Sequence, residues 1–281
     1  MTGYRAAYRH AVLGDPVAHS LSPALHRAGY AALGLSASYD AVRVPAGGLA
    51  AFVAGLDDTW GGLSVTAPLK REALELAVGA SDRARRSGGA NTLLRGPGGW
   101  TADNTDIPGA AAAIRERYDG PVTAAVILGG GATAASTGLA LADLGARRIA
   151  VAVRDAARAA PTLDAIAGHP EAPRVEAVDL ATARPGAAEV VVSTVPAGAQ
   201  TPDVVGRFGD VPVLFEVLYD PWPTPLARAC SGRLVTGLDL LVHQAVLQFA
   251  AFTGAPAPLA EMRAAGERAL AERAAAAAAE Q

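Results

Sequence analysis

Short apolar runs alternate with segments of helical periodicity through the first 120 residues. Runs with strand character end in turns and cover residues 11–13, 38–44, 62–65, 90–95 and 99–101. Apolar positions at helical spacing predict helices at residues 23–33, 45–56, 68–79 and 107–117. Ser22 is the predicted N-cap of the first helix, Pro23 takes its first position, and Gly34 ends it. The alternation predicts an α/β domain.

A linker, Asp119-Gly120-Pro121, precedes a change of pattern. Beyond it, apolar and β-branched runs predict strands at residues 122–128, 148–153, 174–178, 189–192 and 211–215. One predicted helix ends at Gly145, and the next covers residues 156–167. Strand–helix repeats of this kind form a parallel sheet with right-handed crossovers. From Leu238 onward the pattern predicts two helices, separated by Gly254-Ala255-Pro256.

Composition narrows the class of protein. Of 281 residues, 51% are hydrophobic and 18% are charged, which suffices for a core and argues against disorder. The net charge of −3 excludes the basic surface that binds nucleic acid or an anionic membrane. The most apolar later stretch, residues 238–251, is too short to span a bilayer. Arg5 and Arg9 interrupt any secretory signal, and the single cysteine, Cys230, cannot form an internal disulfide or a thiolate metal site. We expect a cytoplasmic protein without a metal.

Lys70 is the one lysine among 24 basic residues, and Asn91 and Asn104 are the only two asparagines. A coding bias toward arginine and alanine explains the general depletion. A residue type that persists at one position under such a bias is expected where its chemistry cannot be replaced. Arginine stays protonated, whereas lysine can exchange a proton. Lys70 is therefore a candidate for proton transfer, although a lone lysine also arises by chance.

A glycine motif, Gly129-x-Gly131-x-x-Ala134, separates a predicted strand from a predicted helix. In dinucleotide-binding folds the first glycine allows a tight turn and the second lets the backbone approach a pyrophosphate. The small third residue allows close packing of helix on strand, and the helix N-terminus offers N–H groups to phosphate. Glycines also mark ordinary turns, but this position between strand and helix favours a cofactor site.

The end of the next strand bears on which cofactor binds. NAD sites place an acid there for the ribose hydroxyls, and NADP sites place an arginine for the 2′-phosphate. This chain has Arg154 and Asp155, followed one turn later by Arg158. The two arginines favour NADP, and the aspartate leaves NAD as a weaker alternative. Solvated arginines without a ligand are the plain alternative.

Polar residues gather at the turns where strands meet helices. His19-Ser20-Leu21-Ser22 carries two hydroxyls that suit a carboxylate or a polyol, and residues 64–70 carry Ser64, Thr66 and Lys70. Asn91-Thr92 begins a strand, and residues 103–106, Asp-Asn-Thr-Asp, end a hairpin. Caps and turns would account for some of these residues, and His243-Gln244 on an apolar helix would ordinarily belong to a core.

Together the motifs resemble the shikimate dehydrogenase (shikimate 5-dehydrogenase) family over nearly the whole chain. The matching segments, in order, are residues 14–26, 65–70, 90–93, 103–106, the glycine loop and 237–244. Residues 219–226 also resemble actinobacterial members. The resemblance implies an α/β fold of two domains with a cleft between them. Residues 1–106 and 238–281 would form the N-terminal α/β substrate-binding domain, and residues 107–237 the Rossmann-like NADP-binding domain.

The resemblance also implies roles for individual residues. Lys70 and Asp106 match the catalytic pair, with Lys70 moving the proton and Asp106 hydrogen-bonding a neighbouring hydroxyl. The implied substrate-binding residues are Ser20, Ser22, Ser64, Thr66, Asn91, Tyr219 and Gln244. The implied cofactor-binding residues are Gly129, Gly130, Gly131, Ala132, Arg154, Arg158, Thr194 and Gly237. The implied activity is the reversible, NADP-dependent reduction of 3-dehydroshikimate to shikimate in chorismate and aromatic amino-acid biosynthesis, by a monomer or homodimer.

Three departures and two alternatives accompany this interpretation. Ser64 stands where many members have asparagine, Val153 and Asp155 replace the usual neighbours of the phosphate-binding arginine, and Arg27 replaces an asparagine. A quinate or aminoshikimate dehydrogenase is the alternative within the enzyme class. A catalytically silent NAD(P)-binding sensor is the alternative outside it, and it would have no reason to keep both Lys70 and Asp106.

Overall fold

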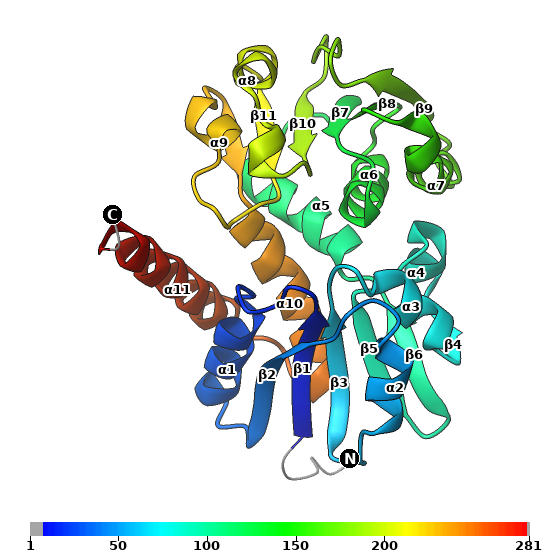
Figure 1. The fold of residues 1–281 in the computed structure, drawn as a ribbon, viewed down its shortest axis with the longest axis vertical. Helices are drawn as coiled ribbons and strands as arrows, with labels where there is room; N and C mark the ends of the chain where they lie inside the picture. Colours follow the sequence, from blue (N-terminus) through cyan, green and yellow to red (C-terminus); the bar gives the residue numbers. More distant parts are fainter. Residues whose placement is uncertain (1–7, 280–281) are drawn as a thin grey trace. The chain divides into compact units, whose positions relative to one another are not determined.

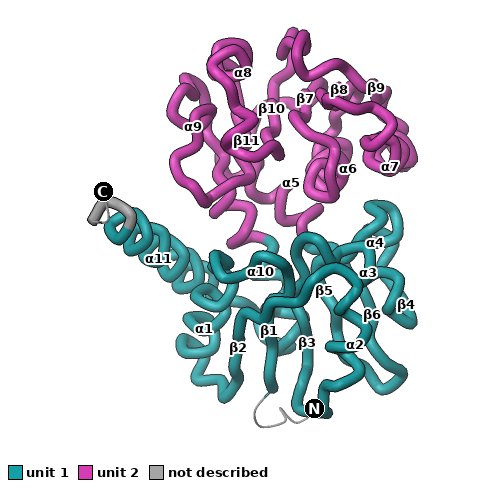
Figure 2. The backbone as a smooth tube through the Cα atoms, viewed as in Figure 1, with its two compact units in different colours: residues 1–105, 244–281 teal, residues 106–243 magenta. Residues whose placement is uncertain are grey.

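The computed structural model describes residues 8–279, which form two compact units (Figures 1 and 2). Unit 1 contains residues 8–105 and 244–279, and unit 2 contains residues 106–243. Each unit is built on a six-stranded sheet covered by helices. The predicted α/β class is confirmed. Within residues 8–279 no helix is both long enough and apolar enough to cross a membrane.

The sheet of unit 1 is mixed and has the strand order β2-β1-β3-β5-β6-β4. Its strands are β1 (Tyr8–Gly14), β2 (Ala37–Arg43), β3 (Trp60–Val65), β4 (Gly79–Ala80), β5 (Thr92–Gly96) and β6 (Gly99–Asp103). Its helices are α1 (Ser22–Ala32), α2 (Leu49–Ala54), α3 (Lys70–Leu76), α4 (Asp82–Ser87), part of α10 (Gly237–Thr253) and α11 (Leu259–Ala279). β1 is parallel to both β2 and β3, whereas β5 is antiparallel to both β3 and β6.

Both faces of this sheet are covered. On one face Leu49 of α2 and Leu69 before α3 pack into a core that includes Leu13 and Leu63. On the other face α10 lies so close to β3 that a methyl group at Gly62 would come within 2.2 Å of the Phe252 ring. The C-terminal helix α11 packs against α1 (Figure 1).

The sheet of unit 2 is entirely parallel, with the order β12-β11-β10-β7-β8-β9. Its strands are β7 (Ala124–Leu128), β8 (Arg148–Val153), β9 (Arg174–Asp179), β10 (Val190–Ser193), β11 (Val213–Glu216) and β12 (Arg233–Val235). Its helices are α5 (Asp106–Arg117), α6 (Ala132–Asp143), α7 (Ala156–Ala167), the short η1 (Ala197–Ala199), α8 (Pro202–Phe208) and α9 (Pro225–Ala229). This is the Rossmann order, in which the order of the parallel strands reverses between β7 and β10.

Three local predictions were wrong. The helix expected over residues 45–56 is only α2, because Gly47 has a φ of +79° and cannot continue a right-handed helix. The helix expected over 68–79 ends at Leu76, because Val78 donates its N–H to Trp100 beside the sheet. Ser22 is not an N-cap: Leu21 has that position, and the hydroxyl of Ser20 accepts the N–H of Ser22 at 3.3 Å.

Two buried histidines lie between α1, α10 and the sheet of unit 1. His26 stacks on Tyr39 with ring centroids 4.1 Å apart, and His10 stacks on Phe252 at 4.9 Å. Burial lowers the pKa of His10 to about 4 and that of His26 to about 3. Both side chains are therefore neutral in the folded protein at neutral pH.

These histidines make stability depend on pH. Because their pKa values are lowered on folding, the stability that the neutral histidines contribute is fully present above the unfolded value of 6.5. It is lost as pH falls from there toward 4 for His10 and toward 3 for His26. At pH 5 each histidine costs about 2 kcal/mol of unfolding free energy. We expect His26→Phe, which keeps an aromatic ring but does not titrate, to lose about 2 kcal/mol less than the unsubstituted protein between pH 7.5 and pH 5. Urea unfolding at both pH values measures this, and equal losses would contradict it.

Candidate active site

Two predicted substrate loops start side by side at one edge of the unit 1 sheet. Leu13 of β1 is paired with Val65 of β3, so the chain after each strand leaves the sheet at the same level. Two backbone bonds join the loops: Thr66 donates to Leu13 at 2.9 Å and Asp15 donates to Ala67 at 3.0 Å. The structure thus brings the Ser20 loop and the Thr66–Lys70 segment to the same edge.

Gly14 permits this approach. A methyl group at Gly14 would lie 2.4 Å from Cγ2 of Thr66. The two serines follow in the same loop: Ser22 is buried at the start of α1, and Ser20 is half-buried. Because the Ser20 oxygen accepts the Ser22 N–H, the Ser20 hydroxyl hydrogen is directed elsewhere and suits an anionic acceptor such as a carboxylate.

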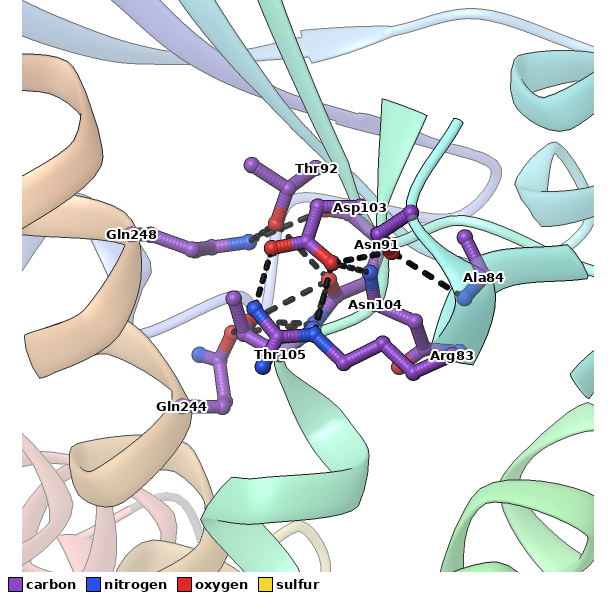
Figure 3. Close-up of polar contacts among 10 residues, drawn as sticks. Arg83, Ala84, Asn91, Thr92, Asp103, Asn104, Thr105, Gln244 and Gln248 are labelled. Carbon is purple, nitrogen blue, oxygen red and sulfur yellow. Dashed lines mark hydrogen bonds and ion pairs between the residues drawn. The ribbon is translucent and has the colours of Figure 1, made fainter. Parts of the chain in front are cut away.

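Asn91 and Gln244 lie together although they are 153 positions apart in the sequence (Figure 3). The Asn91 amide nitrogen donates to Oε1 of Gln244 at 3.3 Å and to the hydroxyl of Thr105 at 2.9 Å. The Asn91 amide oxygen accepts the backbone N–H of Thr105 at 2.8 Å. All three residues are buried. The amide of Asn91 therefore fixes the backbone just before Asp106 while lying beside a second predicted substrate residue.

Two members of this network are absent from the sequence prediction. Thr105 is one, and its signal was present in the Asp-Asn-Thr-Asp block. The other is Gln248, one helical turn after Gln244, whose amide nitrogen donates at 2.9 Å both to the Asn91 carbonyl and to the Thr92 hydroxyl. A polar residue at i+4 from a predicted site residue lies on the same helix face, which was the available signal.

Ser64 has an internal role that the sequence did not indicate. Its hydroxyl accepts from Tyr39 at 2.5 Å and donates to Oε1 of Gln248 at 2.8 Å, and its side chain is buried. Burial raises the pKa of the Tyr39 phenol above its ordinary value, so Tyr39 remains a neutral donor. The contact of Ser64 with substrate stays a prediction.

Lys70 and Asp106 each occupy the first residue of a helix. Lys70 begins α3, as the sequence predicted for the first turn, and its carbonyl accepts the N–H of Ala90 at 2.8 Å. Asp106 begins α5, is 8% exposed, and is joined by a peptide bond to Thr105, whose backbone Asn91 holds. Unit 1 thus fixes the backbone of Lys70 and the residue that precedes Asp106.

The glycine loop of unit 2 fits a dinucleotide. Gly129 has a φ of +106°, and a methyl group there would lie 2.4 Å from Oγ1 of Thr194. Thr194 itself donates to the Leu128 carbonyl at 2.8 Å, so it joins the loop after β10 to the end of β7, at the point where the strand order reverses. A methyl group at Gly131 would meet nothing within 4 Å, which leaves open space for a phosphate.

The helix after this loop offers its N–H groups. α6 has Gly131 at its N-cap, no side-chain hydrogen bond at that cap, and no acidic residue in its first turn. Backbone N–H groups at such a helix N-terminus bind phosphate. Ala134 is fully buried and allows the close packing that the motif requires. These features fit NADP or NAD equally, since both carry a pyrophosphate.

The end of β8 separates the two arginines from Asp155. Arg154 and Arg158 are exposed, whereas the Asp155 carboxylate accepts the backbone N–H of Arg158 at 3.2 Å and caps α7. The cap gives Asp155 a structural reason to be present that is independent of a ribose hydroxyl. The arginines are thus the residues at this strand end that suit a 2′-phosphate.

Tyr219 and Gly237 lie in adjoining segments of unit 2. A methyl group at Gly237 would come within 2.3 Å of the Val217 carbonyl, two residues before Tyr219. The same segment is held by buried Glu216, which accepts from Gln200 at 2.7 Å and from the Leu218 N–H at 3.2 Å. Burial raises the pKa of Glu216. Among residues 8–279 no group of three His, Cys, Asp or Glu side chains could hold a metal ion.

Comparison with known proteins identifies the family. Residues 12–93 match the shikimate dehydrogenase substrate binding domain, and residues 237–265 match the shikimate 5'-dehydrogenase C-terminal domain. A curated shikimate dehydrogenase (NADP(+)) from Anaeromyxobacter sp. is 38% identical over 275 residues, covering 94% of this chain and 97% of that protein. The chain belongs to the shikimate dehydrogenase family. The predicted resemblance is thereby confirmed.

Solved structures of family members agree. The Mycobacterium tuberculosis shikimate dehydrogenase superposes with a TM-score of 0.84 at 42% identity, over 93% of this chain and 99% of that one. The Thermus thermophilus enzyme, in complex with NADP(H) and shikimate, gives 0.82 at 30% identity, over 93% and 99%. A quinate dehydrogenase from Corynebacterium glutamicum in complex with NAD gives 0.79 at 28% identity, also over 93% and 99%. The mycobacterial likeness matches the actinobacterial resemblance of the sequence.

Proposed function

We propose that the protein is an NADP-dependent shikimate dehydrogenase that reversibly reduces 3-dehydroshikimate to shikimate. Curated relatives with that name, at 35–38% identity over most of the chain, support it. The structural observation that carries it is the buried Asn91–Thr105–Gln244 network, whose amide and hydroxyl groups lie next to the end of β3, where the Asn91 carbonyl accepts the N–H of Val65 at 2.7 Å. That strand end leads to Thr66 and Lys70 and is paired with the end of β1, which leads to the Ser20 loop. Such groups suit a small polyhydroxy carboxylate.

The proposal assigns each residue a part in the reaction. When bound, the cofactor would supply a hydride to the ring ketone as NADPH and would accept it back as NADP⁺ in the reverse direction. Lys70 gives a proton to the developing alkoxide, or takes it in reverse, and Asp106 hydrogen-bonds the neighbouring hydroxyl. The residues proposed to hold the substrate carboxylate are Ser20, Ser22 and Tyr219, and those proposed for the ring hydroxyls are Ser64, Thr66, Asn91 and Gln244.

The division of labour between the parts of the chain is also proposed. Residues 1–106 with 238–281 would bind the substrate, which the match of residues 12–93 to the substrate-binding family supports. Residues 107–237 would bind NADP through Gly129–Ala132, Arg154, Arg158, Thr194 and Gly237, which the Rossmann strand order supports. We further propose a cytoplasmic enzyme, monomeric or homodimeric, that acts on small molecules only.

Quinate is the alternative substrate, favoured by the likeness to the Corynebacterium glutamicum quinate dehydrogenase. Quinate carries one more hydroxyl on the carbon that bears the carboxylate. Ser20 and Ser22 approach from a loop and helix start stiffened by Pro23, so an extra hydroxyl would be buried without a partner. Burying an unpaired hydroxyl would weaken quinate binding by about 1–3 kcal/mol, which lowers kcat/KM for quinate by about 5- to 150-fold.

An absorbance assay at the NADPH band tests both candidate substrates. Shikimate and quinate are each offered with NADP and with NAD, and we expect the largest kcat/KM for shikimate with NADP. Comparable values for quinate and shikimate would transfer the proposal to quinate dehydrogenase. No turnover of either substrate with either cofactor would favour a silent NAD(P)-binding protein.

A further inference from the structure

The short helix α4 is tied to the end of β6 by an ion pair with two contacts (Figure 3). Nε of Arg83 donates to Oδ1 of Asp103 at 2.6 Å, and Nη2 of Arg83 pairs with Oδ2. The Ser81 hydroxyl also donates to Oδ1 at 2.6 Å, and so does the backbone N–H of Asn104 at 2.8 Å. The Asp103 carboxylate, three residues before Asp106, therefore accepts hydrogen bonds both from α4 with its N-cap and from its own segment.

A second link joins the other end of α4 to the same segment. The amide nitrogen of Asn104 donates to the Ser87 hydroxyl at 2.9 Å and to the Gly89 carbonyl at 3.0 Å. The next residue, Ala90, donates its N–H to the Lys70 carbonyl. α4 is thus hydrogen-bonded to Asp103 and Asn104, and the segment that follows it is hydrogen-bonded through Ala90 to the backbone of Lys70.

The Arg83–Asp103 ion pair is suited to hold α4 and the end of β6 in a fixed orientation. The side chains are 40% and 19% exposed, whereas those of Arg85 and Asp82, on the same helix, are 60% and 90% exposed and meet only at 3.3 Å. Two-point arginine–carboxylate contacts fix direction as well as distance. Burial alone would raise the pKa of Asp103, but hydrogen bonds from Arg83 and Ser81 hold it below its ordinary value. The pair is therefore charged throughout the neutral range.

We propose that Arg83 is a positioning residue for the reaction. It fixes the carboxylate of Asp103, and with it the backbone of residues 103–105, the segment that leads directly to Asp106. The catalytic part of this inference rests on the proposed dehydrogenase function. The structural part of the inference, that the order of residues 103–105 depends on Arg83, is independent of that function.

The kinetic test compares Arg83→Ala with Arg85→Ala, which removes the same charge from the same helix. We expect kcat with shikimate and NADP to fall about 10- to 100-fold in Arg83→Ala and to stay within twofold in Arg85→Ala, because displacements of an ångström or less have effects of this size. NADP affinity should be unchanged in both, because the predicted cofactor residues lie in unit 2. Guanidinium ion at non-denaturing concentration should restore part of the Arg83→Ala activity, and tetramethylammonium should not.

Amide hydrogen exchange gives a readout that does not depend on activity. A peptide containing residues 103–107 should exchange at least tenfold faster in Arg83→Ala and at the original rate in Arg85→Ala. Arg83→Lys, which keeps the charge but loses the second contact, should be intermediate, and it substitutes for Arg83→Ala if the alanine variant does not fold. Unchanged exchange overturns the proposal whether or not shikimate is turned over. In an active enzyme, a kcat within twofold of the original or a failure of guanidinium to rescue also overturns it. Absence of shikimate turnover in the unsubstituted protein overturns only the proposed function.

Discussion

Lys70→Arg is expected to lower kcat by about 10²–10⁴-fold, nearly as much as Lys70→Ala, although it keeps the positive charge. The size is that of a lost general acid or base. A guanidinium remains protonated at any working pH, so it cannot exchange the proton that the alkoxide needs. A residue that served only as an electrostatic anchor would tolerate this exchange. The lone lysine of a chain that otherwise uses arginine is the observation behind the prediction.

Steady-state kinetics with shikimate and NADP, together with shikimate binding, check the assignment. Substrate affinity should fall far less than kcat in both variants. This distinguishes loss of proton transfer from displacement of substrate by the larger guanidinium, which would weaken binding in Lys70→Arg alone. Arg71→Lys, the opposite exchange at the exposed neighbouring position, is the matched control and should leave kcat within twofold. A Lys70→Arg enzyme with more than a tenth of the original kcat would make Lys70 an anchor.

The Rossmann half of the fold was predictable because its central strands are buried on both faces. Every residue of β7 and β10 is buried, so each gives a continuous apolar run that ends at a turn. Helix α4 gave no such signal. Only Ala84 of its six residues is buried. The helix is held in place by polar contacts of Arg83 and of the N-cap residue Ser81 with Asp103, and such contacts leave no apolar periodicity in the sequence.

The site divides in the same way. Among the predicted site residues, Lys70 and Asn91 are rare residue types beside the start of a helix and the start of a strand, so the sequence alone singles them out. Gln244 lies in the middle of α10 and was indicated only by the family motif. The hydrogen-bond partners that come from distant parts of the chain could not be predicted. The pairing of Ser64 with Tyr39 and Gln248 joins β2, β3 and α10, and nothing in the local sequence of any one segment indicates the other two. Whether a hydroxyl faces substrate or completes an internal network is decided by this tertiary pairing.

NADP preference is expected to depend on Arg154 and Arg158 and to be opposed by the charge of Asp155. Arginine–phosphate contacts contribute about 1.5–3 kcal/mol each before solvent screening. Arg154→Ala should therefore lower kcat/KM for NADP by about 10- to 150-fold at the most, with kcat/KM for NAD changed less than twofold. Both arginines are exposed, so raised salt should reduce the effect.

Asp155 allows charge and structure to be separated. Its carboxylate caps α7 by accepting the N–H of Arg158, and threonine can accept the same N–H without a charge. Asp155→Thr should thus raise the NADP:NAD ratio of kcat/KM at unchanged stability. Asp155→Ala should raise the ratio similarly but also lower the unfolding free energy by about 1 kcal/mol, the usual loss on removing a cap.

Measuring kcat/KM for both cofactors in these variants, with urea unfolding in parallel, tests whether the end of β8 determines the preference for NADP. A ratio that rises in Asp155→Ala but not in Asp155→Thr would mean that a loosened α7, and not the lost charge, alters cofactor choice. A ratio unchanged in both Arg154→Ala and Asp155→Thr would remove this strand end from cofactor discrimination. The choice between the cofactors would then have to be made elsewhere, because the part proposed for the glycine loop is to bind the pyrophosphate, which NADP and NAD share.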